Sequence, residues 1–404
     1  MNTTILETLL WIGLFIVFYA YLGYGLVLFV LILLKRAFGG RQQINDLAEQ
    51  DLPEVTFVVA AYNEEDWIEQ KIENCLAFDY PKDKITLLFV TDGSTDRTPD
   101  LIRQYACPPG VQLSLYHQEG RRGKIAAVER IMAYIDSPIT IYTDANTLVN
   151  KAAIRKIVRH YADAGVGAVA GEKRIAVAKA DAANAAGEGI YWKYESLLKR
   201  WDSELYSVVG AAGELFSIRT DLYQPVPKDS IIEDFFMTMR IAQRGYRVRY
   251  EPAAYAEESS SASVAEELKR KIRIAAGGLQ SIFRLLPVLN IFKYGLLSFQ
   301  YISHRALRWT LAPLALPIVL VANILLSLSG SPFYQWLLAA QLAFYAAALI
   351  GWFLEKRKIK FKAFFVPYYF CVMNYAVYRG FGRYVKGSQS VVWERAKRAE
   401  GVSG

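Results

Sequence analysis

The sequence predicts an α/β domain with a mostly parallel sheet, inserted between transmembrane helices. Two observations carry this prediction. Apolar runs of membrane-spanning length lie near both ends of the 404-residue chain. Between them, short runs rich in β-branched residues alternate with segments of helical spacing. That alternation is typical of right-handed βαβ units, in which helices cover both faces of the sheet.

The composition supports a chain that is part soluble and part membrane-embedded. It is 53% hydrophobic and 14% aromatic, with a mean hydropathy of +0.15. The net charge is +8, but Lys and Arg flank the apolar segments, as they do at cytoplasmic membrane ends. We therefore expect a lipid bilayer, and no nucleic acid, as partner. The three cysteines and three histidines show no metal-ligand or disulfide spacing, which favours a reducing compartment.

The first membrane element is predicted within residues 1–36. Leu9–Leu34 is an almost unbroken apolar run that ends at Lys35-Arg36, and about 20 such residues span a bilayer. Met1–Glu7 contains no Lys or Arg, so the positive-inside rule places the N-terminus outside and the chain after residue 36 in the cytoplasm. Residues 37–53 are expected to be a linker.

Residues 54–278 are predicted to form the cytoplasmic domain. Expected strands are 55–61, 85–91, 111–117, 139–143, 166–170 and 246–250, with 207–219 as a strand or loop. Expected helices are 66–77, 96–105, 124–135, 152–162, 188–205, 231–245 and 265–274. Open parallel sheets bind ligands at the carboxyl ends of their strands, where Asp92 and Asp144 fall.

The rest of the chain is predicted to return to the membrane. Residues 279–303 are apolar but carry charges and prolines, which favours interfacial helices. Within 304–385, runs 309–328 and 334–354 are long enough to span, whereas 364–378 is short and contains Pro367. Because a basic tail, 386–404, follows, we expect 364–378 to be re-entrant or interfacial. The predicted location is the cell membrane, as a multi-pass protein.

Five polar stretches lie close to the ends of predicted strands or open helices. They are AAYNEE at 60–65, TDGSTD at 91–96, RRGK at 121–124, DAN at 144–146 and ED at 233–234. Each also fits a helix cap, a turn or a solvated loop. Asp144 and Asn146 are two residues apart and point to one side of an extended chain. They are suitable oxygen ligands for a divalent cation shared with a phosphate.

The ordered set of motifs resembles the membrane-bound family 2 glycosyltransferases, a group that includes cellulose, hyaluronan and poly-N-acetylglucosamine synthases and ceramide glucosyltransferase. The matching segments are VVAAYNEED, VTDGSTDRT, GKIAAV, TDAN, VGAAGELFSIR and IIEDF. Arg270–Ile274 stands where that family has Gln-x-x-Arg-Trp. The resemblance covers about Val55 to Gly278 and implies a Rossmann-like GT-A domain.

The resemblance also implies the reaction and its residues. A sugar would move from a nucleoside diphosphate sugar, with a UDP-sugar expected, to a lipid-linked or polysaccharide acceptor, inverting to a β-linkage with Mg²⁺ or Mn²⁺ as cofactor. Asp234 would be the general base, beside Glu233, and Asp144 and Asn146 would hold the metal. The residues that the resemblance implies for binding the nucleotide sugar are Ala61, Tyr62, Glu64, Asp92, Lys124, Asp144, Arg270 and Arg273. The expected acceptor-side residues are Gly213, Glu214, Trp192 and Trp201.

Two departures from the family pattern keep alternatives open. Asn146 replaces an Asp of the metal motif, so Asp144 would carry the charge there. Ile274 replaces the Trp on which an acceptor sugar stacks, so transfer of one sugar and processive synthesis both stay open. Two other classes are alternatives: a nucleotidyltransferase and a nucleotide-regulated transporter or scaffold. A nucleotidyltransferase would not be expected to carry Glu233-Asp234. A transporter usually carries ionisable groups within its membrane spans.

Overall fold

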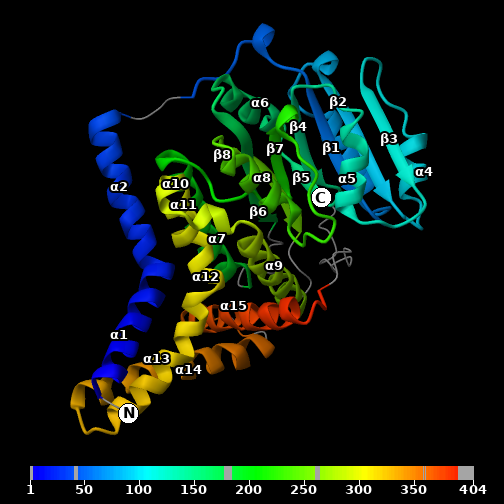
Figure 1. The fold of residues 1–404 in the computed structure, drawn as a ribbon. Helices are drawn as coiled ribbons and strands as arrows, with labels where there is room; N and C mark the ends of the chain where they lie inside the picture. The colour runs from blue at the N-terminus through cyan, green and yellow to red at the C-terminus, as the bar shows by residue number, and fades with distance from the viewer. Residues whose placement is uncertain are drawn as a thin grey trace. The chain divides into compact units, whose positions relative to one another are not determined.

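The computed structural model describes residues 3–40, 44–176, 184–259, 264–357, 359 and 361–389. In its described part the chain forms two compact units (Figure 1). The helical unit comprises Met1–Leu33, Val177–Leu198 and Ser263–Gln389, and the sheet unit comprises Leu34–Ala176 and Lys199–Ala262. Both units are assembled from segments that are distant in sequence, and the predicted domain boundaries stay predictions.

An eight-stranded sheet in the order β3-β2-β1-β4-β7-β6-β8-β5 forms the centre of the sheet unit. The strands are β1 Val55–Ala61, β2 Ile85–Asp92, β3 Gln112–Gln118, β4 Ile139–Asp144, β5 Thr147–Val149, β6 Val166–Ala176, β7 Leu215–Arg219 and β8 Arg247–Ser259. Each predicted strand is present, which confirms the α/β fold class. The three-residue strand β5 was not expected from the sequence.

The first half of this sheet is parallel. β1 pairs in parallel with β2 and with β4, and β2 pairs in parallel with β3. β1 is buried along almost its whole length, as its continuous apolar run requires in a sheet covered on both faces. The helices of this unit are α3 Ile68–Leu76, α4 Thr98–Gln104, α5 Lys124–Met132, α6 Ala153–Val158 and α8 Glu233–Gln243.

The second half of the sheet mixes directions. β7 is antiparallel to both β4 and β6, β5 is antiparallel to β8, and β6 and β8 are parallel. β6 and β8 extend well beyond the short runs that predicted them, because they pair with each other over ten positions with two register shifts. Close packing explains the glycines here. A Cβ atom on Gly171 would lie 2.8 Å from the Leu215 side chain and 2.9 Å from the Ala254 carbonyl.

The predicted apolar runs form helices of the helical unit, and α2 and α7 contribute to both units. Their bounds are α1 Thr3–Phe18, α2 Tyr24–Gly39, α7 Asn184–Leu205, α9 Val264–Arg284, α10 Ile291–Tyr294, α11 Leu296–Tyr301, α12 Leu307–Trp309, α13 Leu311–Ser327, α14 Pro332–Lys356 and α15 Lys362–Val385. Thr3–Gly39, interrupted only by a π-helical turn at Tyr19–Gly23, and Pro332–Lys356 are long and apolar enough to cross a membrane. Leu296–Trp309 and Leu311–Ser327 form a third candidate span if their 53° bend belongs to one crossing.

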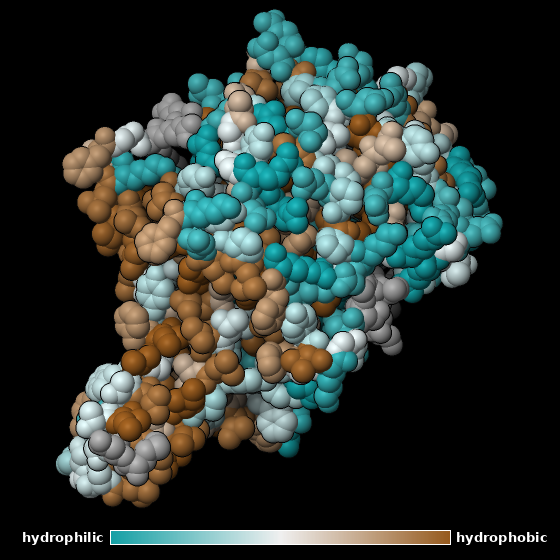
Figure 2. All heavy atoms as spheres, in the orientation of Figure 1, coloured by the Kyte–Doolittle hydropathy of each residue, from teal (hydrophilic) through white to brown (hydrophobic). Residues whose placement is uncertain are grey.

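The surfaces of α1, α13 and α14 carry large exposed apolar side chains, including Phe15, Leu314 and Trp336 (Figure 2). Contiguous exposed apolar surface of this kind suits contact with lipid rather than water.

Two helices differ from the predicted boundaries. α9 continues through Gly277 and Gly278 to Arg284, beyond the predicted helix end at residue 274. A Cβ atom on Gly278 would lie 2.5 Å from the Trp309 ring, so this glycine allows close packing of α9 on α12. α15 is one 24-residue helix that contains Pro367. It is not among the candidate spans found in the described residues. The predicted basic tail lies outside the described residues from position 390 on.

Candidate active site

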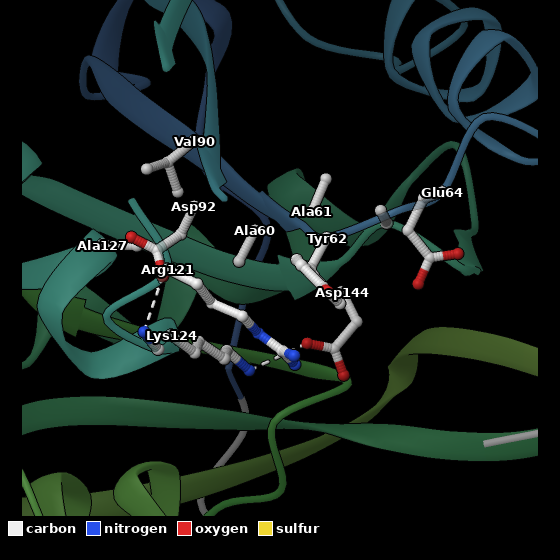
Figure 3. Close-up of a pocket in the computed structure, with 12 residues that line it drawn as sticks. Ala60, Ala61, Tyr62, Glu64, Val90, Asp92, Arg121, Lys124, Ala127 and Asp144 are labelled. Carbon is white, nitrogen blue, oxygen red and sulfur yellow. Dashed lines mark hydrogen bonds and ion pairs between the residues drawn. The ribbon is translucent and has the colours of Figure 1, made fainter. Parts of the chain in front are cut away.

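A pocket of about 490 Å³ opens at the carboxyl ends of β1, β2 and β4 (Figure 3). It is lined by Ala60, Ala61, Tyr62, Glu64, Val90, Asp92, Arg121, Gly123, Lys124, Ala127, Asp144 and Ala145. Six of the predicted nucleotide-sugar residues are therefore brought together: Ala61, Tyr62, Glu64, Asp92, Lys124 and Asp144. The parallel pairing explains this, because it aligns the strand ends along one edge of the sheet.

Asp92, at the end of β2, is fixed by the loop before α5. Its Oδ2 atom accepts hydrogen bonds from the backbone N–H groups of Arg122, at 2.7 Å, and Gly123, at 2.6 Å. Its buried Oδ1 atom has no hydrogen-bond partner among the described residues, and Arg130 Nη1 lies 3.7 Å away. One carboxylate oxygen thus holds the loop, and the other is ion-paired with Arg130 but accepts no hydrogen bond within the described residues.

Arg121 is a pocket residue that the sequence reasoning did not single out. Its guanidinium lies 3.7 Å from the centre of the Tyr62 ring, a cation–π contact. Its backbone also packs on Gly93, where a Cβ atom would lie 2.6–2.8 Å from Arg121 atoms. The RRGK motif contained Arg121, but the position over Tyr62 depends on two loops that are distant in sequence.

The residues predicted to hold a metal lie at the end of β4. The Asp144 side chain is 9% exposed, and its Oδ1 atom is 2.8 Å from Lys124 Nζ (Figure 3). Lys124 also lies 3.1 Å from Glu233 Oε1, at the start of α8. The Asn146 Oδ1 atom is buried and has no hydrogen-bond partner in the described part of the chain. A buried carbonyl oxygen without a partner normally costs stability, so the pair fits an oxygen-liganded divalent cation.

Ionisation in this cluster is strongly perturbed. Burial, followed by the Glu233 carboxylate, raises the pKa of Asp234 to about 7, and Lys124 opposes that rise. Burial also raises the pKa of Asp144 above its ordinary value, again against the influence of Lys124. Burial alone would lower the pKa of Lys124, but Asp144 and Glu233 raise it above the usual lysine value. A carboxylate with a pKa near neutrality suits a general base.

The backbone at Gly213 lies directly against the Asp234 carboxylate. A Cβ atom on Gly213 would be 3.2 Å from Asp234 Oδ2 and 3.4 Å from Lys124 Nζ. Asp234 itself is held by its place in the first turn of α8, where the Thr238 hydroxyl donates to its carbonyl oxygen at 2.8 Å. Any larger residue at position 213 would therefore take up space beside this carboxylate.

A second buried ionic cluster lies on the predicted acceptor side. Lys173, on β6, is ion-paired with both Glu214 and Glu258. The Glu214 carbonyl oxygen accepts a 2.8 Å hydrogen bond from the Thr143 hydroxyl, on β4. The fully buried Lys71 lies behind that strand end and donates to the Thr147 carbonyl oxygen at 2.6 Å. Neither lysine was singled out from the sequence, because their partners are far away in the chain.

Four other predicted residues do not line the pocket. Arg270, Arg273 and Trp192 belong to the helical unit, where Arg270 pairs with Glu267 at 3.0 Å and Lys271 lies 4.9 Å from the Trp192 ring centre. Trp201 belongs to the sheet unit but does not line the pocket. The roles of these four residues stay predictions.

Comparison with known proteins decides the family. Residues 53–277, more than half of the chain, match the model of a family described as "Glycosyltransferase like family 2". The chain belongs to this glycosyltransferase family. The resemblance inferred from the motifs is thereby confirmed, and the protein is a glycosyltransferase with a GT-A-type sheet domain.

Relatives of this family 2 glycosyltransferase include polysaccharide synthases. It is 28% identical over 246 residues to a poly-β-1,6-N-acetyl-D-glucosamine synthase of Staphylococcus aureus, a match that covers 59% of this chain and 58% of the relative. It is 24% identical over 252 residues to the probable glycosyltransferase YdaM of Bacillus subtilis, with the same coverage. The match thus spans less than two thirds of the length of these relatives.

A solved structure has the same fold over nearly the whole chain. The mannosyltransferase PcManGT from Pyrobaculum calidifontis, in complex with GDP-Man and Mn²⁺, superposes with a TM-score of 0.71. The sequence identity is 23%, and the superposition covers 95% of this chain and 100% of the mannosyltransferase chain. At this identity the likeness concerns the fold, which agrees with the mixed sheet and the helices around it.

Proposed function

We propose that this glycosyltransferase moves a sugar from a nucleoside diphosphate sugar, a UDP-sugar by preference, to a lipid-linked or polysaccharide acceptor with inversion to a β-linkage. The observation that carries the proposal is the position of Asp234. This carboxylate, whose pKa is raised to about 7, lies beside Gly213 and next to Glu233, which shares Lys124 with the strand-end Asp144. A base of suitable pKa thus adjoins the pocket proposed for the donor.

In the proposed reaction Asp234 takes the proton from the acceptor hydroxyl while that oxygen forms a bond to the anomeric carbon. The bond from that carbon to the diphosphate oxygen breaks, and its electron pair stays with the leaving nucleoside diphosphate. A single displacement from the opposite face converts an α-linked donor into a β-linked product. A positioned base of this kind contributes on the order of 10²–10⁴-fold to the rate.

Mg²⁺ or Mn²⁺ is the proposed cofactor, held by the Asp144 carboxylate and the Asn146 carbonyl oxygen. Such a cation would neutralise the charge that develops on the leaving diphosphate. Among the described residues no three His, Cys, Asp or Glu side chains gather into a metal site. The protein would therefore supply few ligands, and the diphosphate would supply others, as is usual for Mg²⁺.

The donor would lie in the pocket at the strand ends. The Oδ1 atom of Asp92, which accepts no hydrogen bond within the described residues, can accept one from the base or ribose, and Tyr62 and Glu64 line the same pocket. Arg270 and Arg273 are proposed to hold the diphosphate, since a guanidinium group presents several fixed donors to phosphate oxygens. Trp192, Trp201, Gly213 and Glu214 are proposed on the acceptor side.

A membrane setting fits the acceptor classes. The candidate spans in the described residues support a multi-pass protein of the cell membrane, and the catalytic domain is proposed to lie in the cytoplasm. The S. aureus relatives are named as poly-β-1,6-N-acetyl-D-glucosamine synthases, which keeps processive synthesis as the alternative to a single transfer. In both cases the acceptor hydroxyl would meet the same base.

The deciding experiment incubates purified protein in detergent or membranes with a panel of nucleotide sugars, with Mg²⁺, Mn²⁺ or EDTA, and then sizes the product. We expect release of nucleoside diphosphate only with divalent metal and with one preferred donor. A short glycolipid would indicate single transfer, and a long polymer would indicate processive synthesis. Absence of release with every nucleotide sugar would contradict the proposal and favour a regulatory nucleotide-binding domain.

A further inference from the structure

One ammonium group neutralises two buried carboxylates in the active site. Lys124 Nζ lies 2.8 Å from Asp144 Oδ1 and 3.1 Å from Glu233 Oε1. The three side chains are only 13%, 9% and 11% exposed, in that order. They come from three elements, since Lys124 opens α5, Asp144 ends β4 and Glu233 opens α8. The contact therefore depends on the tertiary structure.

Lys124 contacts Oδ1, one of the two Asp144 carboxylate oxygens that a divalent cation could use. Asp144 brings the negative charge of the proposed metal site, because Asn146 offers only a neutral carbonyl oxygen. A lysine ammonium and a divalent cation bound to one small, poorly hydrated carboxylate repel each other strongly. The Lys124 ammonium group and the divalent cation therefore cannot both bind Asp144 strongly at the same time.

We propose that Lys124 is an internal counter-ion that competes with the divalent cation for Asp144, so that metal binds well only together with the donor diphosphate. The inference rests on the proposed metal-dependent donor site and goes beyond it. A diphosphate brings several negative charges, which both draw the lysine away from Asp144 and add oxygen ligands for the cation. Lys124 would then have two roles in one turnover: it closes the metal site, and afterwards it contacts the donor.

The surroundings of Lys124 permit this exchange. Its long side chain carries three rotatable donors, and Glu233 keeps a second carboxylate within reach. Gly213 has no side chain and so leaves space beside the ammonium group. A Cβ atom at this position would lie 3.4 Å from Nζ. Glu233 is thus assigned as a positioning residue that holds Lys124 beside the site when Asp144 is taken by the metal.

The test is a direct Mn²⁺ titration of the full chain in detergent, read from the electron paramagnetic resonance signal of free Mn²⁺. Wild type is compared with Lys124→Met, first without nucleotide and then with UDP. Coupling between two sites typically changes affinity by about 5–150-fold. We expect Lys124→Met to bind Mn²⁺ without nucleotide at least about fivefold more tightly than wild type. UDP should strengthen Mn²⁺ binding much more in wild type than in the variant.

Lys156→Met is the matched control, because Lys156 forms an exposed ion pair with Asp46 on the same unit and should leave Mn²⁺ affinity unchanged. Lys124→Gln is a second variant, used in case Lys124→Met folds poorly. A thermal unfolding curve for every protein shows which variants are folded. Equal or weaker Mn²⁺ binding by folded Lys124 variants without nucleotide would overturn the competition. That outcome differs from failure of the proposed function, in which wild type would show no UDP-dependent Mn²⁺ binding.

Discussion

The two halves of the eight-stranded sheet show two ways of building one active site. In the half formed by β3, β2, β1 and β4 every pair is parallel, and all four strands come from one continuous stretch of the chain, residues 55–144. In the half formed by β7, β6, β8 and β5, antiparallel and parallel pairs join distant segments. The parallel half carries the residues proposed for donor binding at its strand ends, whereas the mixed half carries the cluster of Lys173, Glu214 and Glu258 on the proposed acceptor side.

This difference shows where chemistry can be expected from local pattern. A parallel half made of βαβ units aligns its strand ends automatically, so Asp92 and Asp144 meet the same pocket. The strand ends of the mixed half are not aligned in this way, and its groups are positioned by long-range hydrogen bonds and ion pairs. The Thr143–Glu214 hydrogen bond joins the two halves at the edge of the site.

The largest expected effect comes from Asp234→Asn, which removes the proposed base. We expect transfer to fall on the order of 10²–10⁴-fold while donor binding is retained, because the amide keeps the shape of the side chain. Radiolabelled sugar transfer and equilibrium donor binding measure the two effects. Asp100→Asn, at an exposed carboxylate on α4, is the control. Full turnover by a folded Asp234→Asn protein would refute the assignment.

The next comparison is within the donor half, between Asp144→Ala and Asn146→Ala. Asp144 would carry the charge at the metal, so its loss should abolish metal-dependent donor binding. Asn146→Ala removes one neutral ligand and should only weaken that binding. Titration of the donor with and without Mn²⁺ measures both. Equal losses in the two variants would mean that charge is not what distinguishes these ligands.

Gly213→Ala tests the mixed half. The added methyl group would crowd Asp234 and Lys124, and a displacement of about 1 Å near the reacting groups can cost about 10²-fold in rate. We expect kcat for transfer to fall by up to that amount, with the donor Kd changed little. Gly39→Ala, where a Cβ atom meets nothing within 4 Å, should be neutral. Unaltered transfer would show that the acceptor does not approach along Gly213.

The pH dependence sharpens the role of Asp234. A base works only when deprotonated, and the pKa of Asp234 is raised to about 7. We therefore expect kcat/KM to rise about tenfold per pH unit below that value and to level off above it. The profile should be measured at saturating Mn²⁺. If kcat/KM instead falls only near pH 4, Asp234 titrates as an ordinary carboxyl group.

The smallest effect is expected for Thr143→Val, which removes the hydroxyl that donates to the Glu214 carbonyl oxygen but keeps the side-chain shape. A typical intramolecular hydrogen bond contributes about 1 kcal/mol, so we expect the KM for the acceptor to rise roughly fivefold. Steady-state kinetics at varied acceptor and varied donor separate the two halves. A donor KM that rises as much as the acceptor KM would show that Thr143 supports both halves equally.

Much of the parallel half could be predicted from the sequence. The apolar runs at β1, β2 and β4 and the polar residues that follow them indicated the strands, the ligand-binding edge and six of the pocket residues. Local pattern was sufficient because strand direction, burial and the position of polar residues are all encoded within short segments.

The mixed half and the charge pattern of the site could not be predicted in the same way. β5 is too short for a periodic signal, and β6 and β8 owe their length to each other. Arg121 over Tyr62, Lys71 behind β4, and Lys173 between Glu214 and Glu258 all depend on contacts between distant segments. Their residue types alone are also typical of solvated surface groups.

The amino-acid sequence was sufficient for the family, the fold class and the oxygen-rich motifs, because each lies within a continuous segment. Which charges face each other was settled only in three dimensions. The sheet and the start of α8 bring Lys124 between Asp144 and Glu233 and leave Asp234 beside Gly213. Burial then strengthens every interaction among these groups, and the shared lysine follows from their packing rather than from any motif.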